Sequence, residues 1–118
     1  LKIDTIVFID EISKDLCKEI EMLAPFGFGN SRPVLAAKNV NLPFPPNIVG
    51  KNGDHLKMRI KGNKKAVDAI GFNMGGLISE FDFEVNRFDI AFTLSINRWN
   101  DKEILQLKLK GIRLTEEQ

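Results

Sequence analysis

Five cations that alternate along two stretches of the sequence are the side chains whose type and spacing could contact a nucleic acid. Lys57, Arg59 and Lys61 alternate with apolar residues, and Lys108 and Lys110 repeat this spacing nearer the carboxyl end. In an extended strand, alternate side chains point the same way and lie about 6.8 Å apart, a spacing similar to that of phosphates along a single strand. The pattern indicates a phosphate-binding face, and a solvated strand face whose cations prevent aggregation is the ordinary alternative.

Trp99, the only tryptophan, lies in a polar segment from Asn97 to Asp101 that also contains Arg98. An aromatic side chain in such a loop can stack on a base, which contributes ~1–3 kcal/mol. Alternatively, the indole folds back over one end of the fold, since a lone tryptophan usually packs at least one face. The polar neighbours favour stacking, but both interpretations stay open.

The phenylalanines outside the strands are expected to pack. Phe72 is the weaker stacking candidate, because its apolar neighbours favour a core position, and Phe26 and Phe28 are assigned to packing in a connector.

Residues for catalysis and metal binding are scarce. His55 is the only histidine and Cys17 the only cysteine. The sequence therefore offers no nucleophile with a second histidine-type base for catalysis, and no set of His and Cys ligands for a metal ion. Glu80, Asp82 and Glu84 would share a side if extended, but carboxylates in such a run are usually solvated. We therefore expect neither a catalytic residue nor a metal site in this chain.

The composition is that of an ordinary globular domain. Among 118 residues, 43% are hydrophobic and 28% charged, and 17 Lys and Arg against 16 Asp and Glu leave a net charge of +1. This balance excludes a strongly basic binder, so nucleic-acid binding would depend on local charge placement. No stretch approaches the ~20 apolar residues of a membrane span, so no membrane partner is expected.

A single cysteine excludes an internal disulfide and agrees with a reducing compartment, for which cytoplasm is the default. The amino end, which begins at Leu1, has neither an initiator Met nor a signal-peptide pattern, so we expect a fragment of a longer chain.

The amino-terminal part of the chain, residues 1–32, is predicted to contain a strand, a helix and a connector. Residues 1–9 are predicted to form a strand. Apolar residues at helical spacing predict an amphipathic helix over 10–24, with Ser13 as its N-cap and Pro25 ending it. A connector with the sequence Pro-Phe-Gly-Phe-Gly-Asn follows, and we place a domain boundary near Arg32.

Residues 33–118 contain five predicted strands separated by turn residues. They are 34–42, resuming at 47–49 after Pro43, Pro45 and Pro46; 55–61; 66–72; 88–97; and 103–114. Asn52-Gly53 indicates a turn before the second strand, and a short helical stretch over 75–83 is expected between the third and fourth. Three strands, a helix and two strands is the order of the OB-fold, a mainly β, five-stranded Greek-key barrel. Its second and third strands and its loops between strands one and two and between strands four and five bind oligonucleotides or oligosaccharides.

Short motifs in a fixed order then connect the chain to a known family. They are Leu23 to Asn30 followed by Pro33-Val34, Val49-Gly50-Lys51 running into His55-Leu56-Lys57, Asp68 to Phe72, and Asn97 to Asn100 before Leu105-Gln106-Leu107-Lys108. Together they resemble the carboxy-terminal portion of the RecJ single-strand-specific exonucleases. The Pro43 to Pro46 segment departs from the strand-like residues expected there.

The resemblance implies an OB-fold that holds single-stranded DNA and guides its 5′ end toward a separate catalytic core of the DHH type, which uses Mn or Mg. The chain has no Asp-His-His motif, so it would be the non-catalytic binding module of a 5′ to 3′ exonuclease of bacterial recombination and repair. By the same resemblance, Lys57 and Lys108 fall on basic strand positions, and Asn97, Trp99 and Asn100 on the family's loop between strands four and five.

Two functions therefore remain after the sequence is read. The first is binding of single-stranded DNA through Lys57, Arg59, Lys61, Arg98, Trp99, Lys108 and Lys110. The second is protein docking, in which the barrel anchors the catalytic core of its parent chain or a single-strand-binding protein. Low net charge favours docking, and the aligned cations favour DNA. A freestanding enzyme has no supporting residues.

Overall fold

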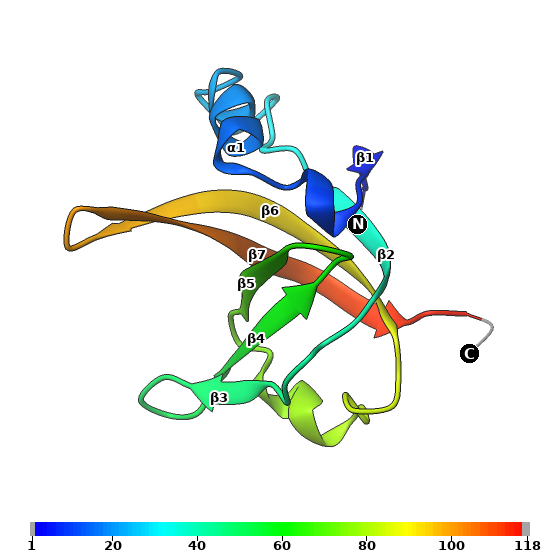
Figure 1. The fold of residues 1–118 in the computed structure, drawn as a ribbon. Helices are drawn as coiled ribbons and strands as arrows, with labels where there is room; N and C mark the ends of the chain where they lie inside the picture. Colours follow the sequence, from blue (N-terminus) through cyan, green and yellow to red (C-terminus); the bar gives the residue numbers. More distant parts are fainter. Residues whose placement is uncertain (1, 117–118) are drawn as a thin grey trace.

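A computed structural model of the chain describes residues 2–116, which form a barrel with an amino-terminal helical segment packed on it (Figure 1). The barrel strands are β2 (Leu35–Val40), β3 (Asn47–Val49), β4 (His55–Lys61), β5 (Ala66–Gly71), β6 (Phe88–Trp99) and β7 (Lys102–Leu114). With β1 (Thr5–Ile6), they hydrogen-bond in the order β1-β2-β6-β7-β5-β4-β3. The β5–β7 pair is parallel, and the other pairs within the barrel are antiparallel.

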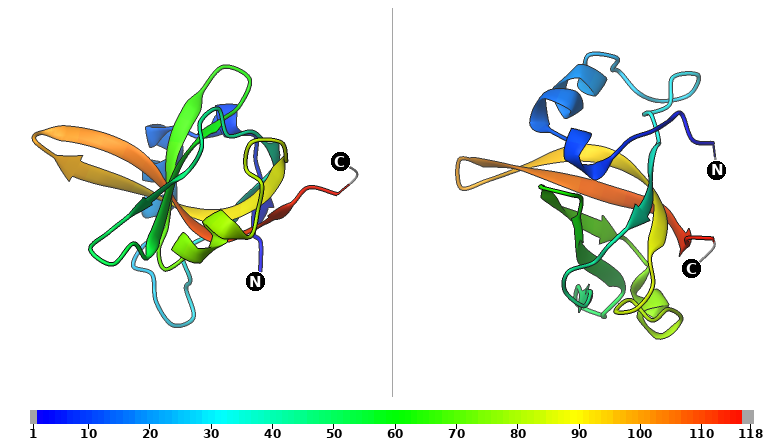
Figure 2. Two further views of the ribbon diagram at one scale, coloured as in Figure 1. Left: turned by 90° about the horizontal axis from the view of Figure 1, so that it is seen from below. Right: turned by 45° about the vertical axis from the view of Figure 1, so that its right-hand side comes forward.

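The first strand of the barrel is broken into two halves. β2 pairs with β6, while β3 pairs with β4 on the other side. Pro43, Pro45 and Pro46 lie between the halves and have no N–H to donate to a ladder, which accounts for the break. A bridge from Asn41 to Lys61 joins the end of β2 to β4, and the ring of strands is visible from below in Figure 2. The topology confirms the predicted OB-fold, with the first strand counted in two pieces.

Alternation along the strands separates core from surface as predicted. On β4, Leu56, Met58 and Ile60 are buried while the intervening cations are exposed. On β6 and β7, the following apolar residues lie in or against the same core: Ile90, Phe92, Leu94, Ile96, Leu105, Leu107 and Leu109. The strands therefore place every second side chain of β4 on the outside of the barrel.

The β6–β7 hairpin is longer than predicted and projects from the barrel as an arm (Figures 1 and 2). Cross-strand pairing continues to Trp99 and Lys102, and only Asn100 and Asp101 form the turn. Their φ angles are +49° and +61°, as a two-residue type I′ turn requires, and Asn and Asp tolerate this conformation best among residues with a side chain. The conformational preference of Asn100 and Asp101 thus confines the turn to these two residues, and both strands continue up to it.

The amino-terminal segment differs from its prediction in detail. Only Thr5 and Ile6 form a strand, β1, which runs parallel to β2. A 3₁₀ turn, η1 (Ile9–Glu11), precedes the helix α1 (Lys14–Glu21), so the predicted helix over 10–24 is shorter at both ends. The N-cap is confirmed, because Ser13 Oγ accepts a hydrogen bond from the Leu16 N–H at 3.0 Å.

The amino-terminal segment and the barrel share one apolar core. Ile9, Ile12, Cys17 and Ile20 are buried in the same cluster as the barrel strands. Burial raises the pKa of the Cys17 thiol, and the nearby carboxylate of Glu21 adds to the effect. Cys17 therefore contributes to packing as a neutral thiol.

Asp10 fastens this segment to the turn between β4 and β5. Its carboxylate accepts hydrogen bonds from the backbone N–H groups of Asn63, Lys64 and Lys65, at 3.2, 3.1 and 3.0 Å. The Lys64 and Lys65 bonds are the main causes that hold the pKa of Asp10 below its usual value. Lys65 also donates through Nζ to the Ile12 carbonyl. These contacts fix where α1 begins relative to the outer face of the barrel.

Two aromatic assignments from the sequence are wrong. Phe28 is fully exposed rather than packed, and Phe72 is 51% exposed rather than in the core. Phe26 is half-buried, as expected of a packing residue, and Arg32 lies 4.5 Å above its ring centre. The expected helix over 75–83 is a shorter 3₁₀ turn, η2 (Gly75–Ser79).

Across residues 2–116, none of the helices combines the length and the apolarity needed to cross a bilayer.

Candidate nucleic-acid interface

The predicted basic strand lies on an outer face formed by β4, β5 and β7. Residues directly opposite each other in a sheet share a side. Lys57 is opposite Ile70, which in turn is opposite Lys108, so these two lysines flank Ile70 on the same side. Arg59 and Lys61 continue along β4 on that side. Three strands therefore bring Lys57, Arg59, Lys61 and Lys108 onto one surface, which we call the cationic face.

An ion pair occupies the middle of the cationic face. Arg59 Nη1 lies 2.7 Å from Asp68 Oδ1, its cross-strand neighbour on β5. Both side chains are partly exposed, a setting in which such pairs contribute ~0–1 kcal/mol to stability. Among residues 2–116, Lys57, Lys61 and Lys108 form no such ion pair with a carboxylate. The sequence did not reveal this pair, because it depends on the β4–β5 register.

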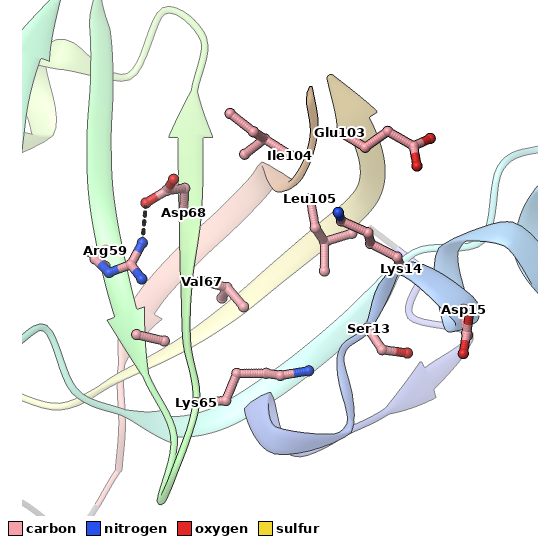
Figure 3. Close-up of a pocket in the computed structure, with 11 residues that line it drawn as sticks. Ser13, Lys14, Asp15, Arg59, Lys65, Val67, Asp68, Glu103, Ile104 and Leu105 are labelled. Carbon is pink, nitrogen blue, oxygen red and sulfur yellow. Dashed lines mark hydrogen bonds and ion pairs between the residues drawn. The ribbon is translucent and has the colours of Figure 1, made fainter. Parts of the chain in front are cut away.

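A hollow of about 500 Å³ adjoins the cationic face where β5, the first residues of β7 and the start of α1 meet (Figure 3). Lys14 and Lys65 line it from the amino-terminal segment and the β4–β5 turn, and Asp15, Asp68 and Glu103 line it as well. Charges of both signs thus meet there, unlike on β4. The two lysines were not singled out from the sequence, because only the packing of α1 brings Lys14 to this edge.

Trp99 lies at the tip of the hairpin arm, away from the core, and 70% of it is exposed. Every second cross-strand pair of the hairpin faces the same side of the sheet. The Trp99–Lys102 pair and the pair that contains Lys108 belong to the same series, so the indole lies on the outward side of the arm, which continues into the cationic face. Its exposure does not match a residue that closes a barrel end. Arg98 points to the other side of the hairpin and forms an ion pair with Glu103 at 3.2 Å.

Lys110 does not extend the period-two pattern of Lys108. Phe92 pairs with Leu109 while Ala91 pairs with Gly111, so Lys110 is the extra residue of a β-bulge. The bulge ends regular alternation, and Lys110 lies past the last β7 residue that pairs with β5. Lys110 is therefore exposed but outside the row that contains Lys57 and Lys108.

Metal-ligating side chains do not gather in the part of the chain that the structure describes, residues 2–116: no three His, Cys, Asp or Glu residues form a cluster. Of the acidic residues considered from the sequence, Asp82 instead accepts a hydrogen bond from the Glu84 N–H at 3.1 Å, a local turn contact.

Comparison with known proteins agrees with this architecture. Residues 3–111 match the RecJ OB domain family. The chain is 32% identical over 115 residues to the single-stranded-DNA-specific exonuclease RecJ of Bacillus subtilis, a match that covers 98% of the chain and 14% of that protein.

Two solved structures have a similar fold. They are RecJ of Thermus thermophilus in complex with Mn²⁺ (TM-score 0.60, 24% identity) and with Mg²⁺ (TM-score 0.59, 22% identity). In each case the similarity covers 85% of this chain and 14% of the other. The chain thus spans about one seventh of the length of the relatives it matches. Since the family match covers nearly the whole chain and the strand order is that of an OB-fold, the chain belongs to the RecJ OB domain family.

Proposed function

We propose that the cationic face and the adjoining tip of the β6–β7 hairpin bind single-stranded DNA without base specificity. The observation that carries the proposal is the sheet register, which places Lys57, Lys61 and Lys108 on one side of three neighbouring strands. Contacts from lysine to phosphate give affinity and position but carry no sequence information. Trp99 would add stacking, which tolerates any base.

In this proposal the chain is the DNA-binding module of a metal-dependent 5′ to 3′ exonuclease. The B. subtilis relative is named as a single-stranded-DNA-specific exonuclease, and the T. thermophilus relative was solved with Mn²⁺ and with Mg²⁺. Both are about seven times longer than the matched region, which leaves room for a catalytic core that holds the metal. The module would guide the strand to that core in the cytoplasm of a bacterial cell.

The lysines of β4 provide the direct test. Replacing Lys57 and Lys61 together with alanine should weaken binding to unstructured oligonucleotides of every sequence. It should also reduce the magnitude of the slope of log K against log salt by about 1.4, or ~0.7 per lost contact. Adding Arg59→Ala should change the slope less than a further lysine would, because Asp68 already pairs with Arg59.

Lys18→Ala is the matched control, since Lys18 is an exposed lysine on α1, outside the cationic face. Binding titrations at several salt concentrations measure both effects. A double variant with the wild-type slope would contradict phosphate contact on β4.

A second candidate function, protein docking, is favoured by a hollow on the other side of the barrel. Ile6, Ala36, Ala91 and Gly111 lie in register across β1, β2, β6 and β7 and line an outer hollow of about 370 Å³. Its occupant would be the catalytic core of the parent chain. A chain that only docks should show little salt-dependent binding of oligonucleotides, which separates the two functions.

The proposal also predicts the absence of chemistry in this chain alone. Purified residues 1–118 should leave 5′-labelled single strands intact with Mn²⁺ or Mg²⁺ added, because residues 2–116 contain no cluster of side chains that could hold the metal ion. Gel analysis of the labelled strand measures this. Metal-dependent release of mononucleotides that persists after removal of contaminating nucleases would contradict it.

A further inference from the structure

A histidine and a phenylalanine lie next to the cationic face, at the end farthest from Trp99. Leu56 pairs with Gly71, so the residues just outside that pair, His55 on β4 and Phe72 after β5, fall on the same outer side as Lys57. Their ring centres are 5.2 Å apart with an interplanar angle of 77°, an edge-to-face contact. The cationic face thus ends in an aromatic pair, although the sequence placed Phe72 in the core.

Neighbouring groups hold this pair in place. The Asn73 backbone N–H donates to His55 Nδ1 at 3.0 Å, which leaves Nε2 as the protonated nitrogen of the neutral ring. On its other side the imidazole lies against Gly50, where an added Cβ would come within 2.8 Å of His55 Cδ2. Phe72 therefore rests on a fixed imidazole while half of its own surface stays exposed.

Phe72 and Trp99 are separated along the sheet by about the length of a short oligonucleotide. On β7, Lys108 follows Lys102, the partner of Trp99, by six positions; Lys108 is opposite Ile70, and Phe72 follows Ile70 by two positions. At ~3.3 Å per residue these eight positions span about 26 Å along the strands, or about four intervals between phosphates at ~6.8 Å each. Binding sites on OB-folds start at about four nucleotides.

We propose that Phe72, supported by His55, is a base-stacking site, so that a single strand crossing Lys57 and Lys61 is held by aromatic side chains at both ends of the cationic face. This rests on the proposed function, since it requires the strand to follow the cationic face. Its ligand is the π-face of any unpaired base, with the backbone of the same nucleotide beside Lys57.

The test compares Phe72→Ala with the wild-type chain on two 12-nucleotide strands, one of normal thymidines and one with abasic sites throughout. On the normal strand the affinity should fall about five- to 150-fold, the range expected for one lost base stack. On the abasic strand Phe72→Ala and wild type should bind alike. Phe72→Leu, which keeps apolar bulk but cannot stack, should behave as Phe72→Ala.

Phe28→Ala is the matched control, since it removes an exposed phenylalanine from the connector rather than from the cationic face, and it should bind like wild type. A chain carrying both Trp99→Phe and Phe72→Trp should show fluorescence quenching when the normal strand is added, because its one tryptophan then occupies the stacking site.

The outcomes separate this site from the general proposal. Equal losses on both strands, wild-type affinity of Phe72→Ala, or unchanged fluorescence in the chain carrying Trp99→Phe and Phe72→Trp would overturn the stacking site. If at the same time the Lys57 and Lys61 variants still lower the salt slope, binding by the cationic face stands. A wild-type chain that binds neither strand would overturn both.

Discussion

Replacing Ile12 with alanine should destabilise the whole chain by about 2–5 kcal/mol, although Ile12 lies in the amino-terminal segment and outside the barrel. Its side chain is fully buried and belongs to the same core cluster as Leu56, Phe92 and Leu107. Removing three carbons there loses their transfer free energy and leaves a cavity that the closed sheet cannot readily fill. Because domains of this size are stable by about 5–15 kcal/mol, the variant should fold but with a much smaller margin.

Urea denaturation measures the effect as a lower midpoint at an unchanged slope. Phe28→Ala, a truncation of an exposed residue in the same segment, should leave the midpoint within error. The result also tests the boundary predicted near Arg32. If residues 1–32 were an independent appendage, the barrel of the Ile12→Ala variant would unfold at the same urea midpoint as in the wild-type chain.

Replacing Trp99 with alanine should cost ~1–3 kcal/mol of single-strand affinity and very little stability. The indole is at the tip of the hairpin arm, beyond the apolar core, and its neighbours Asn100 and Asp101 form the turn by their own backbone preferences. Truncating it therefore removes a stacking surface while the turn and the cross-strand ladder remain. DNA should also quench the fluorescence of the wild-type chain, in which Trp99 is the only tryptophan.

Equilibrium binding and urea denaturation of the same variant distinguish the two roles of Trp99 weighed from the sequence. A loss of ~3 kcal/mol or more of stability with normal DNA binding would indicate a residue that covers the barrel. Trp99→Phe is a useful comparison, since it retains an aromatic face and should retain most of the affinity.

Much of the fold could be predicted because its strands show their periodicity locally. The alternation from His55 to Lys61 predicts a half-buried strand on its own, and the prolines after β2 predict the break in the first barrel strand. Predictions became wrong where the answer depends on distant partners. Phe28 has the apolar character of a packing residue, but no element of the fold within residues 2–116 covers it.

The candidate site, too, could be predicted from the sequence only in part. The common direction of Lys57, Arg59 and Lys61 follows from strand geometry alone. The carboxylate opposite Arg59 and the bulge at Lys110 follow instead from the register of β4 with β5 and of β6 with β7, which spacing along one strand does not contain.

The proline-broken first strand has a consequence for self-association. The two halves of this strand divide their hydrogen bonds between β6, from Phe88 to Phe92, and β4, from His55 to Lys57. The strand order ends in β1 and β3, which are two and three residues long, and prolines precede β3 directly. Such short edges offer another copy little backbone on which to add a strand. The departure from a regular strand at Pro43 to Pro46 thus keeps the β3 edge of the sheet short and disfavours strand addition at that edge.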